Sequence, residues 1–167
     1  MKYLVIILSI LSLWYFLPAF SGNLISPAMR ITIPNDYFEM FTWFQGQPTD
    51  QRVAIFPIHT FWGWTYYKWN YQGAGFLQFG IPQPIMDRDY NRWSLVNQRY
   101  QQEMSYAVYN QNPKIIADVL AKYNIRWILL DRSVISPGNT EASLLTWRIP
   151  ALLTQTGTVT LEKNFGT

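Results

Sequence analysis

The sequence predicts an α/β protein with an N-terminal transmembrane helix, followed by a small, three-layer-like domain with a short, mainly parallel sheet. Two observations predict this class. The first is an apolar stretch from Tyr3 to Phe20 that contains no charged residue. The second is the order of the later segments, in which short apolar strands alternate with amphipathic helices. Such an order implies right-handed crossovers between parallel strands.

The N-terminal stretch is long enough to cross a bilayer, because eighteen helical residues span roughly 27 Å. Lys2 precedes it, and no further charge occurs before Arg30. This charge distribution favours an N-terminus inside the cell and an extracytoplasmic location for the bulk of the chain. Ala19–Ser21 also fits a signal-peptide cleavage site. We therefore expect residues 1–23 to be a membrane anchor or a signal peptide. The anchor is favoured because the run exceeds the usual signal-peptide core.

The composition excludes several functional classes. Charged residues make up only 14% of the 167 positions, below the roughly 25% of soluble domains. The chain has no cysteine, which excludes disulfides, thiolate zinc sites and cysteine nucleophiles. Lysine and arginine are scattered, so nucleic acid is not an expected partner despite the net charge of +3. The single histidine argues against a metal site, and the sequence predicts no cofactor.

Local patterns define the elements of the expected domain, residues 24–167. Helices are predicted from Asn35, as N-cap, to Gly46, over 92–109, from Pro113 to about 123 with Asn112 as cap, and over 140–153. Strands are predicted over 52–58, 125–131 and 158–163, with an irregular crossing loop over 81–91. The helix over 92–109 should bury a stripe made of Trp93, Val96, Tyr100, Met104 and Ala107. Because the chain ends soon after the last strand, we expect a domain truncated at its C-terminus.

An aromatic run over residues 61–80 holds nine rings in twenty positions. Neither helical nor strand periodicity accounts for it, and its glycines indicate a loop-rich segment. The flat faces of tyrosine and tryptophan can stack on the C–H surface of sugar rings, while the side chains of Asn70, Gln72 and Gln78 can bond hydroxyls. The alternative is packing, either as a small core under a long loop or as a belt against the membrane or partner transmembrane helices. The candidate ligand-binding residues here are Trp62, Trp64, Tyr67 and Trp69.

Polar residues next to this run add further candidates. His59 follows a predicted strand, where α/β folds place ligands, although a lone histidine also serves as a structural hydrogen-bonding group. Asp87, Arg88 and Asp89 form the densest charge group. In an extended loop both carboxylates point the same way, as acid–base catalysis on a glycosidic bond requires. Alternatively, one carboxylate caps the following helix and the other pairs with Arg92.

The layout resembles a known family of membrane proteins. It consists of an apolar helix, the strand RVAIFP, the Trp-, Tyr- and Gly-rich tract, QPIMDRDY and KYNIRWILLD. This order is similar to the C-terminal extracytoplasmic domain of polytopic bacterial glycosyltransferases of the GT-C type. The resemblance implies sugar transfer from a polyprenyl-phosphate donor, with acidic catalytic residues in an early loop between transmembrane helices. That loop is outside this sequence, so no catalytic residue is carried over.

The sequence therefore predicts an anchored accessory or substrate-contacting module of cell-envelope glycan assembly, part of a membrane glycosyltransferase. Its expected partners are the membrane, a glycan or polyprenyl-linked sugar, and transmembrane helices. Two alternatives stay open. One is a small glycoside-acting hydrolase that uses Asp87, Asp89 or Glu103. The other is a structural module that packs on partner transmembrane helices.

Overall fold

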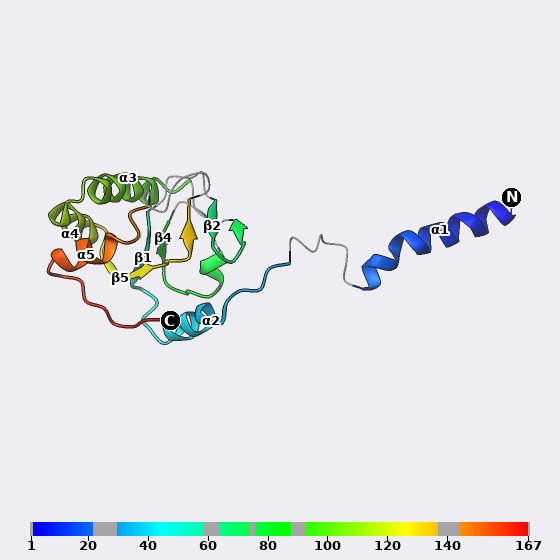
Figure 1. The fold of residues 1–167 in the computed structure, drawn as a ribbon, viewed down its shortest axis with the longest axis horizontal. Helices are drawn as coiled ribbons and strands as arrows, with labels where there is room; N and C mark the ends of the chain where they lie inside the picture. Colours follow the sequence, from blue (N-terminus) through cyan, green and yellow to red (C-terminus); the bar gives the residue numbers. More distant parts are fainter. Residues whose placement is uncertain are drawn as a thin grey trace. The chain divides into compact units, whose positions relative to one another are not determined.

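The computed structural model describes residues 2–21, 30–58, 64–73, 76–87, 93–136 and 144–166. The chain divides into two compact units, Met1–Thr32 and Ile33–Thr167. The first contains one helix, α1 (Lys2–Phe20), in which no residue is buried. This helix is long and apolar enough to cross a membrane, with a mean hydropathy of 2.1. Figure 1 labels the helix of the first unit and most elements of the second.

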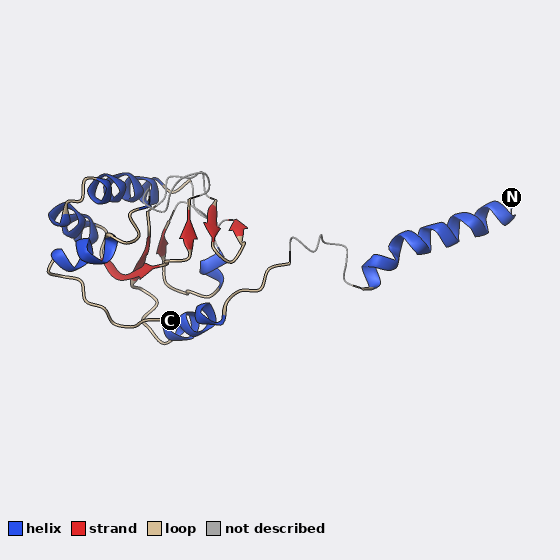
Figure 2. Ribbon diagram, in the orientation of Figure 1, coloured by secondary structure: helices blue, strands red, loops and turns tan. Residues whose placement is uncertain are grey.

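The second unit is an α/β domain, as the sequence predicts. Its helices are α2 (Asn35–Gln45), α3 (Leu95–Tyr109), α4 (Pro113–Lys122) and α5 (Ile149–Gln155), with a short 3-10 helix, η2 (Phe76–Phe79). Its strands are β1 (Arg52–Phe56), β2 (Thr65–Tyr67), β3 (Gln72–Gly73), β4 (Ile85–Met86), β5 (Ile125–Leu130) and β6 (Val134–Ile135). Figure 2 shows the strands with the helices around them.

The strands form two small sheets. Sheet A has the order β4-β1-β5, and both of its pairings are parallel. Sheet B has the order β3-β2-β6 and is antiparallel. The parallel sheet confirms the predicted class, because β1 and β5 are the two apolar segments expected as strands. Sheet B was not predicted, since its three strands are only two or three residues long.

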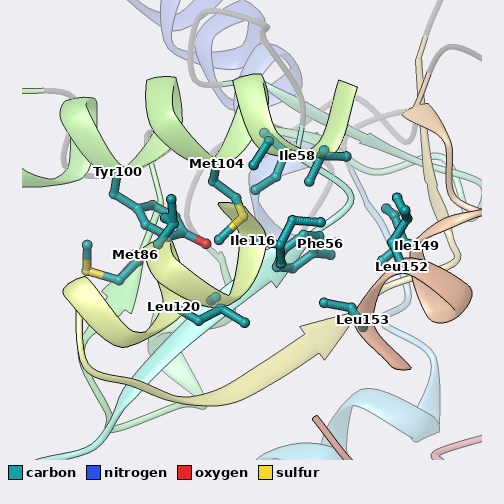
Figure 3. Packing of buried hydrophobic residues seen from close by; sticks show 14 of the residues in the cluster. Phe56, Ile58, Met86, Tyr100, Met104, Ile116, Leu120, Ile149, Leu152 and Leu153 are labelled. Atoms are coloured by element: carbon teal, nitrogen blue, oxygen red, sulfur yellow. The ribbon is translucent and has the colours of Figure 1, made fainter. Parts of the chain in front are cut away.

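Sheet A is covered on both faces, which makes the domain three-layered. Successive residues of β1 alternate between two buried clusters, with Ala54 and Phe56 in one and Val53 and Ile55 in the other. The first cluster joins the sheet to α3, α4 and α5, as Figure 3 shows for Tyr100, Met104, Ile116 and Leu153 among others. The second joins it to α2, η2 and sheet B. Burial on both faces explains why residues 53–56 of β1 and 127–130 of β5 read as continuous apolar runs.

Two predicted elements were wrong at the C-terminal side of the sequence. No strand forms over 158–163, where the chain is largely exposed. The predicted helix over 140–153 is also too long: residues 145–148 form turns, and α5 begins only at Ile149. The physical reason lies in Pro150, whose fixed φ and missing N–H suit the first turn of a helix. Residues 140–143 lie outside the described part of the chain.

Three smaller predictions also need correction. The segment expected as an irregular loop contains β4, which is only two residues long and directly follows two closely spaced prolines, so no strand pattern was visible. Pro34, not Asn35, occupies the N-cap position of α2. Trp93 precedes α3 and is 94% exposed, and Val96 is half exposed, so neither belongs to the buried stripe. The prediction that Asn112 caps α4 is confirmed, because its side chain accepts from the Ile115 amide at 3.2 Å.

Candidate functional site: a groove beside strand β4

The described part of the aromatic run forms a small core. Trp69 stacks on Tyr71 with ring centroids 5.3 Å apart and an angle of 12° between the rings. The edge of Tyr37 on α2 meets the Trp69 ring at 5.6 Å. Tyr67 is buried and contacts the same rings, while Trp64 stays half exposed. Most of these side chains therefore serve packing. Of the three candidates in this run that the structure describes, Trp64, Tyr67 and Trp69, Trp64 is the one that is exposed and so available to a ligand.

A hydrogen-bond network ties this aromatic core to the end of β5. The Tyr37 hydroxyl donates to Oδ2 of Asp131 at 2.5 Å and lies 2.7 Å from the Ser133 hydroxyl. Trp69 donates its indole N–H to the Tyr37 oxygen at 3.3 Å. Burial, followed by the Asp131 charge, raises the pKa of Tyr37 well above its ordinary value. The phenol is thus held protonated as a donor, which suits a structural link and not a proton-transfer site.

A groove of about 550 Å³ runs beside β4 and under the start of α3. Its lining comes from three parts of the sequence: the start of β1, the segment from η2 to the residue after β4, and the first turn of α3 with the residue before it. The lining residues are Arg52, Gln78, Ile81, Pro82, Gln83, Pro84, Ile85, Met86, Asp87, Ser94, Val96 and Asn97. Of the predicted site residues that the structure describes, only Asp87 lies here.

The end of the groove near β1 is fixed by two polar side chains. Gln83 is buried, and its Nε2 donates to the carbonyls of Phe44 and Gln47 at the end of α2, at 2.7 and 3.2 Å. Arg52 donates from Nη1 to the Tyr123 carbonyl at 2.8 Å. Because both side chains bind carbonyls at helix ends, they satisfy groups that a helix leaves without internal partners. This end of the groove is therefore held by α2 and α4.

The other end is formed where β4 meets α3. Ser94 caps α3 by accepting from the Asn97 amide at 3.3 Å, and Asn97 donates from Nδ2 to the Asp87 carbonyl at 3.0 Å. Ser94 thus takes the capping role that we had assigned to a carboxylate of the preceding loop. Asp87 is 8% exposed and sits at the carboxyl end of β4, the position at which parallel α/β sheets bind ligands.

The other predicted site residues that the structure describes do not line this groove. His59, Trp62, Arg88 and Asp89 lie outside the described residues. Glu103 lies on α3, where it pairs with Lys122 of α4 at 2.6 Å and does not line the groove. Within the described ranges, no group of three or more His, Asp or Glu side chains is placed to hold a metal ion.

Sequence reasoning missed most of the groove. Gln78 was considered only as a possible sugar contact of the aromatic run, and Arg52, Gln83 and Asn97 were not considered at all. A signal did exist in Pro82-Gln83-Pro84, because a residue that precedes a proline is held in extended backbone, which fixes the position of the Gln83 amide.

No model of a known protein family matches the chain, and no match was found among curated protein sequences or solved structures. The groove and the apolar helix are therefore the features of this structure that bear on function.

Proposed function

We propose that this chain is a membrane-anchored domain that binds a glycan in the groove beside β4. In this proposal it acts as an accessory, substrate-contacting module of cell-envelope glycan assembly on the extracytoplasmic side, and contributes to a membrane glycosyltransferase. The bound sugar is free or carried on a polyprenyl phosphate. The apolar helix α1 supports the membrane location, since 19 residues with no buried side chain and high hydropathy match a bilayer span.

The observation that carries the proposal is the mixed lining of the groove. Polar side chains are contributed by Arg52, Gln78, Gln83, Asp87, Ser94 and Asn97, and apolar ones by Ile81, Pro82, Pro84, Ile85, Met86 and Val96. A sugar ring presents the matching surfaces, because its hydroxyls need donors and acceptors while its C–H faces need apolar contacts. A volume of about 550 Å³ is within the range of small-ligand sites and accommodates one or two sugar rings.

The carboxylates favour binding over hydrolysis. Glycosidases use two carboxyl groups on either side of the scissile bond, roughly 5–10 Å apart. Among the described lining residues Asp87 is the single carboxylate, and Glu103 is engaged with Lys122. The structural alternative is also weakened, because the rings of Tyr67, Trp69 and Tyr71 pack within their own domain. We therefore propose recognition without turnover.

The test uses the full-length chain in lipid nanodiscs, applied to an array of bacterial envelope glycans. We expect selective binding, and we expect Gln78→Ala to weaken it about tenfold, because Gln78 is half-buried in the groove and one ligand hydrogen bond is lost. Gln102→Ala is the matched control, since Gln102 is exposed on α3 and does not line the groove.

Each outcome bears on the proposal. If the wild-type chain binds no glycan on the array, the proposal is wrong. If Gln78→Ala and Gln102→Ala bind equally well, the groove is not the site. Release of reducing sugar by the wild-type chain, lost in Asp87→Asn, would instead support the hydrolase.

A further inference from the structure

Strand β4 is an edge of sheet A, and the groove lies along this edge. On one side β4 pairs with β1, with Ile85 opposite Val53 and Met86 opposite Ala54. The Val53 amide donates to the Pro84 carbonyl at 3.0 Å. Among the strands that the structure describes, the sheet order places no other beside β4.

The register determines which backbone groups of β4 face the groove. In a parallel pair, alternate residues of a strand direct their N–H and C=O toward the neighbour. The Pro84 carbonyl points toward β1, so the backbone N–H and C=O of Met86 point toward β1 as well. The backbone N–H and C=O of Ile85 both point away from β1. The Asp87 carbonyl points the same way as that of Ile85, and it is reached by Asn97 from α3. The outer edge of β4 thus faces the start of α3.

Ile85 therefore offers an adjacent donor and acceptor to a ligand. Ile85 lines the groove and is half-buried. In the part of the chain that the structure describes, no hydrogen bond is found for its backbone N–H or C=O. A buried or half-buried backbone pair of this kind normally has a partner, in the protein, in water or in a ligand.

We propose that the backbone of Ile85 recognises a vicinal diol of the bound sugar. One hydroxyl oxygen accepts from the Ile85 N–H, and the neighbouring hydroxyl donates its proton to the Ile85 carbonyl. A hydroxyl can do either, because it carries one donor and two acceptor lone pairs. This inference rests on the proposed glycan function and specifies the ligand as a sugar with two adjacent unsubstituted hydroxyls.

An extended peptide is the other ligand that a strand edge can take, by adding a strand to the sheet. Such a peptide needs a row of alternating donor and acceptor pairs. Here the regular strand is two residues long, and the next outward carbonyl, that of Asp87, already accepts from Asn97. One complete pair remains, at Ile85, and this matches a diol better than a strand.

The decisive variant is Ile85→Pro, with Ile85→Val as its control. Proline removes the outward N–H and leaves the bonds to β1, since edge strands tolerate proline where the N–H faces away from the sheet. Valine keeps the N–H and most of the side chain. In nanodiscs, we expect Ile85→Pro to bind cellotetraose about tenfold more weakly than Ile85→Val does, through loss of one hydrogen bond. Permethylated cellotetraose, which has no hydroxyl donors, should bind wild type similarly weakly.

The Ile85 amide resonance of the wild-type chain gives a second measurement that does not depend on the proline variant folding. It should shift on addition of cellotetraose and stay in place with the permethylated sugar. Equal binding by Ile85→Pro and Ile85→Val, or an unmoved Ile85 resonance while cellotetraose binds, overturns the diol and leaves the glycan function standing. Absence of binding to every glycan tested overturns both. If the Ile85 resonance shifts with a valine- and threonine-rich hexapeptide and not with the sugar, the groove binds a peptide by strand addition and not a diol.

Discussion

The hydroxyl of Tyr37 and the carboxylate of Asp131 are joined by a 2.5 Å hydrogen bond across 94 residues of sequence. Tyr37 lies on α2, and Asp131 immediately follows β5. Oδ1 of Asp131 also accepts from the amide and the hydroxyl of Ser133 at 2.8 and 2.7 Å. The carboxylate therefore links the first helix of the domain, the end of the parallel sheet and the turn into β6.

We expect Tyr37→Phe to lower the free energy of unfolding by about 1.5–3 kcal/mol, as for loss of a hydrogen bond to a charged group. The measurement is urea unfolding of the full chain in mild detergent, followed by near-ultraviolet circular dichroism. Tyr106→Phe is the control, because Tyr106 is 63% exposed, and its change should stay within about 0.5 kcal/mol. Equal stability of the two variants would show that the link to Asp131 contributes nothing.

Tyr100 leads to a prediction of the opposite sign. It is fully buried among α3 and α4, and its hydroxyl has no hydrogen-bond partner among the described residues. Burial raises the pKa of Tyr100 far above its ordinary value. Because an unpaired buried hydroxyl costs about 1–3 kcal/mol, we expect Tyr100→Phe to leave the free energy of unfolding unchanged or to raise it. A loss larger than about 1 kcal/mol would reveal a partner for this hydroxyl.

The same two phenols predict how stability depends on alkaline pH. The pKa values of Tyr37 and Tyr100 are raised in the folded state. The contribution of this shift to the free energy of unfolding is complete below the pKa of an unfolded tyrosine, about 10. The contribution is lost as the pH rises from about 10 toward the pKa of the folded state. We expect the urea midpoint to fall above pH 10, and to fall less steeply in Tyr100→Phe. Absorbance at 295 nm should show these phenols ionising only on unfolding.

Gly80 allows a close approach between η2 and α2. A Cβ at this position would overlap the ring of Phe41. We expect Gly80→Ala to destabilise the domain by about 1–3 kcal/mol through overpacking, and Phe41→Ala in the same chain to remove part of that penalty. Gly46→Ala is the control, because Gly46 has a φ of −82° and its Cβ would make an ordinary 3.4 Å contact. Thermal unfolding that ranks Gly80→Ala with Gly46→Ala would contradict the expectation.

The elements that could be predicted from the sequence are those with a local signal, such as an apolar run or a helix cap. Residues 53–56 of β1 and 127–130 of β5 are continuous apolar runs because sheet A is covered on both faces, and Asn112-Pro113 marks the start of α4. β4 could not be read in the same way, because a strand of two residues that directly follows Pro84 carries no periodicity. The alternation of Val159 and Leu161 suggested a strand, but alternation does not supply a neighbouring strand, and Leu161 is 87% exposed.

The groove was less predictable than the fold. Its polar residues come from segments as distant as Arg52 and Asn97, and their proximity depends on the strand order β4-β1-β5. Asp87 was found because it belongs to a dense charge group next to an aromatic run. The role proposed for Ile85 depends on its backbone N–H and C=O, and the pattern of side chains in the sequence does not show which backbone groups are unpaired.

The central position of β1 has a consequence for synthesis. β1 leaves the ribosome before both of its neighbours, and the Tyr123 carbonyl that binds Arg52 lies 71 residues downstream. At typical translation speeds this delay is on the order of 10 s. During that interval the apolar strand has two open edges. The nascent chain should therefore depend on holding factors until β5 has emerged.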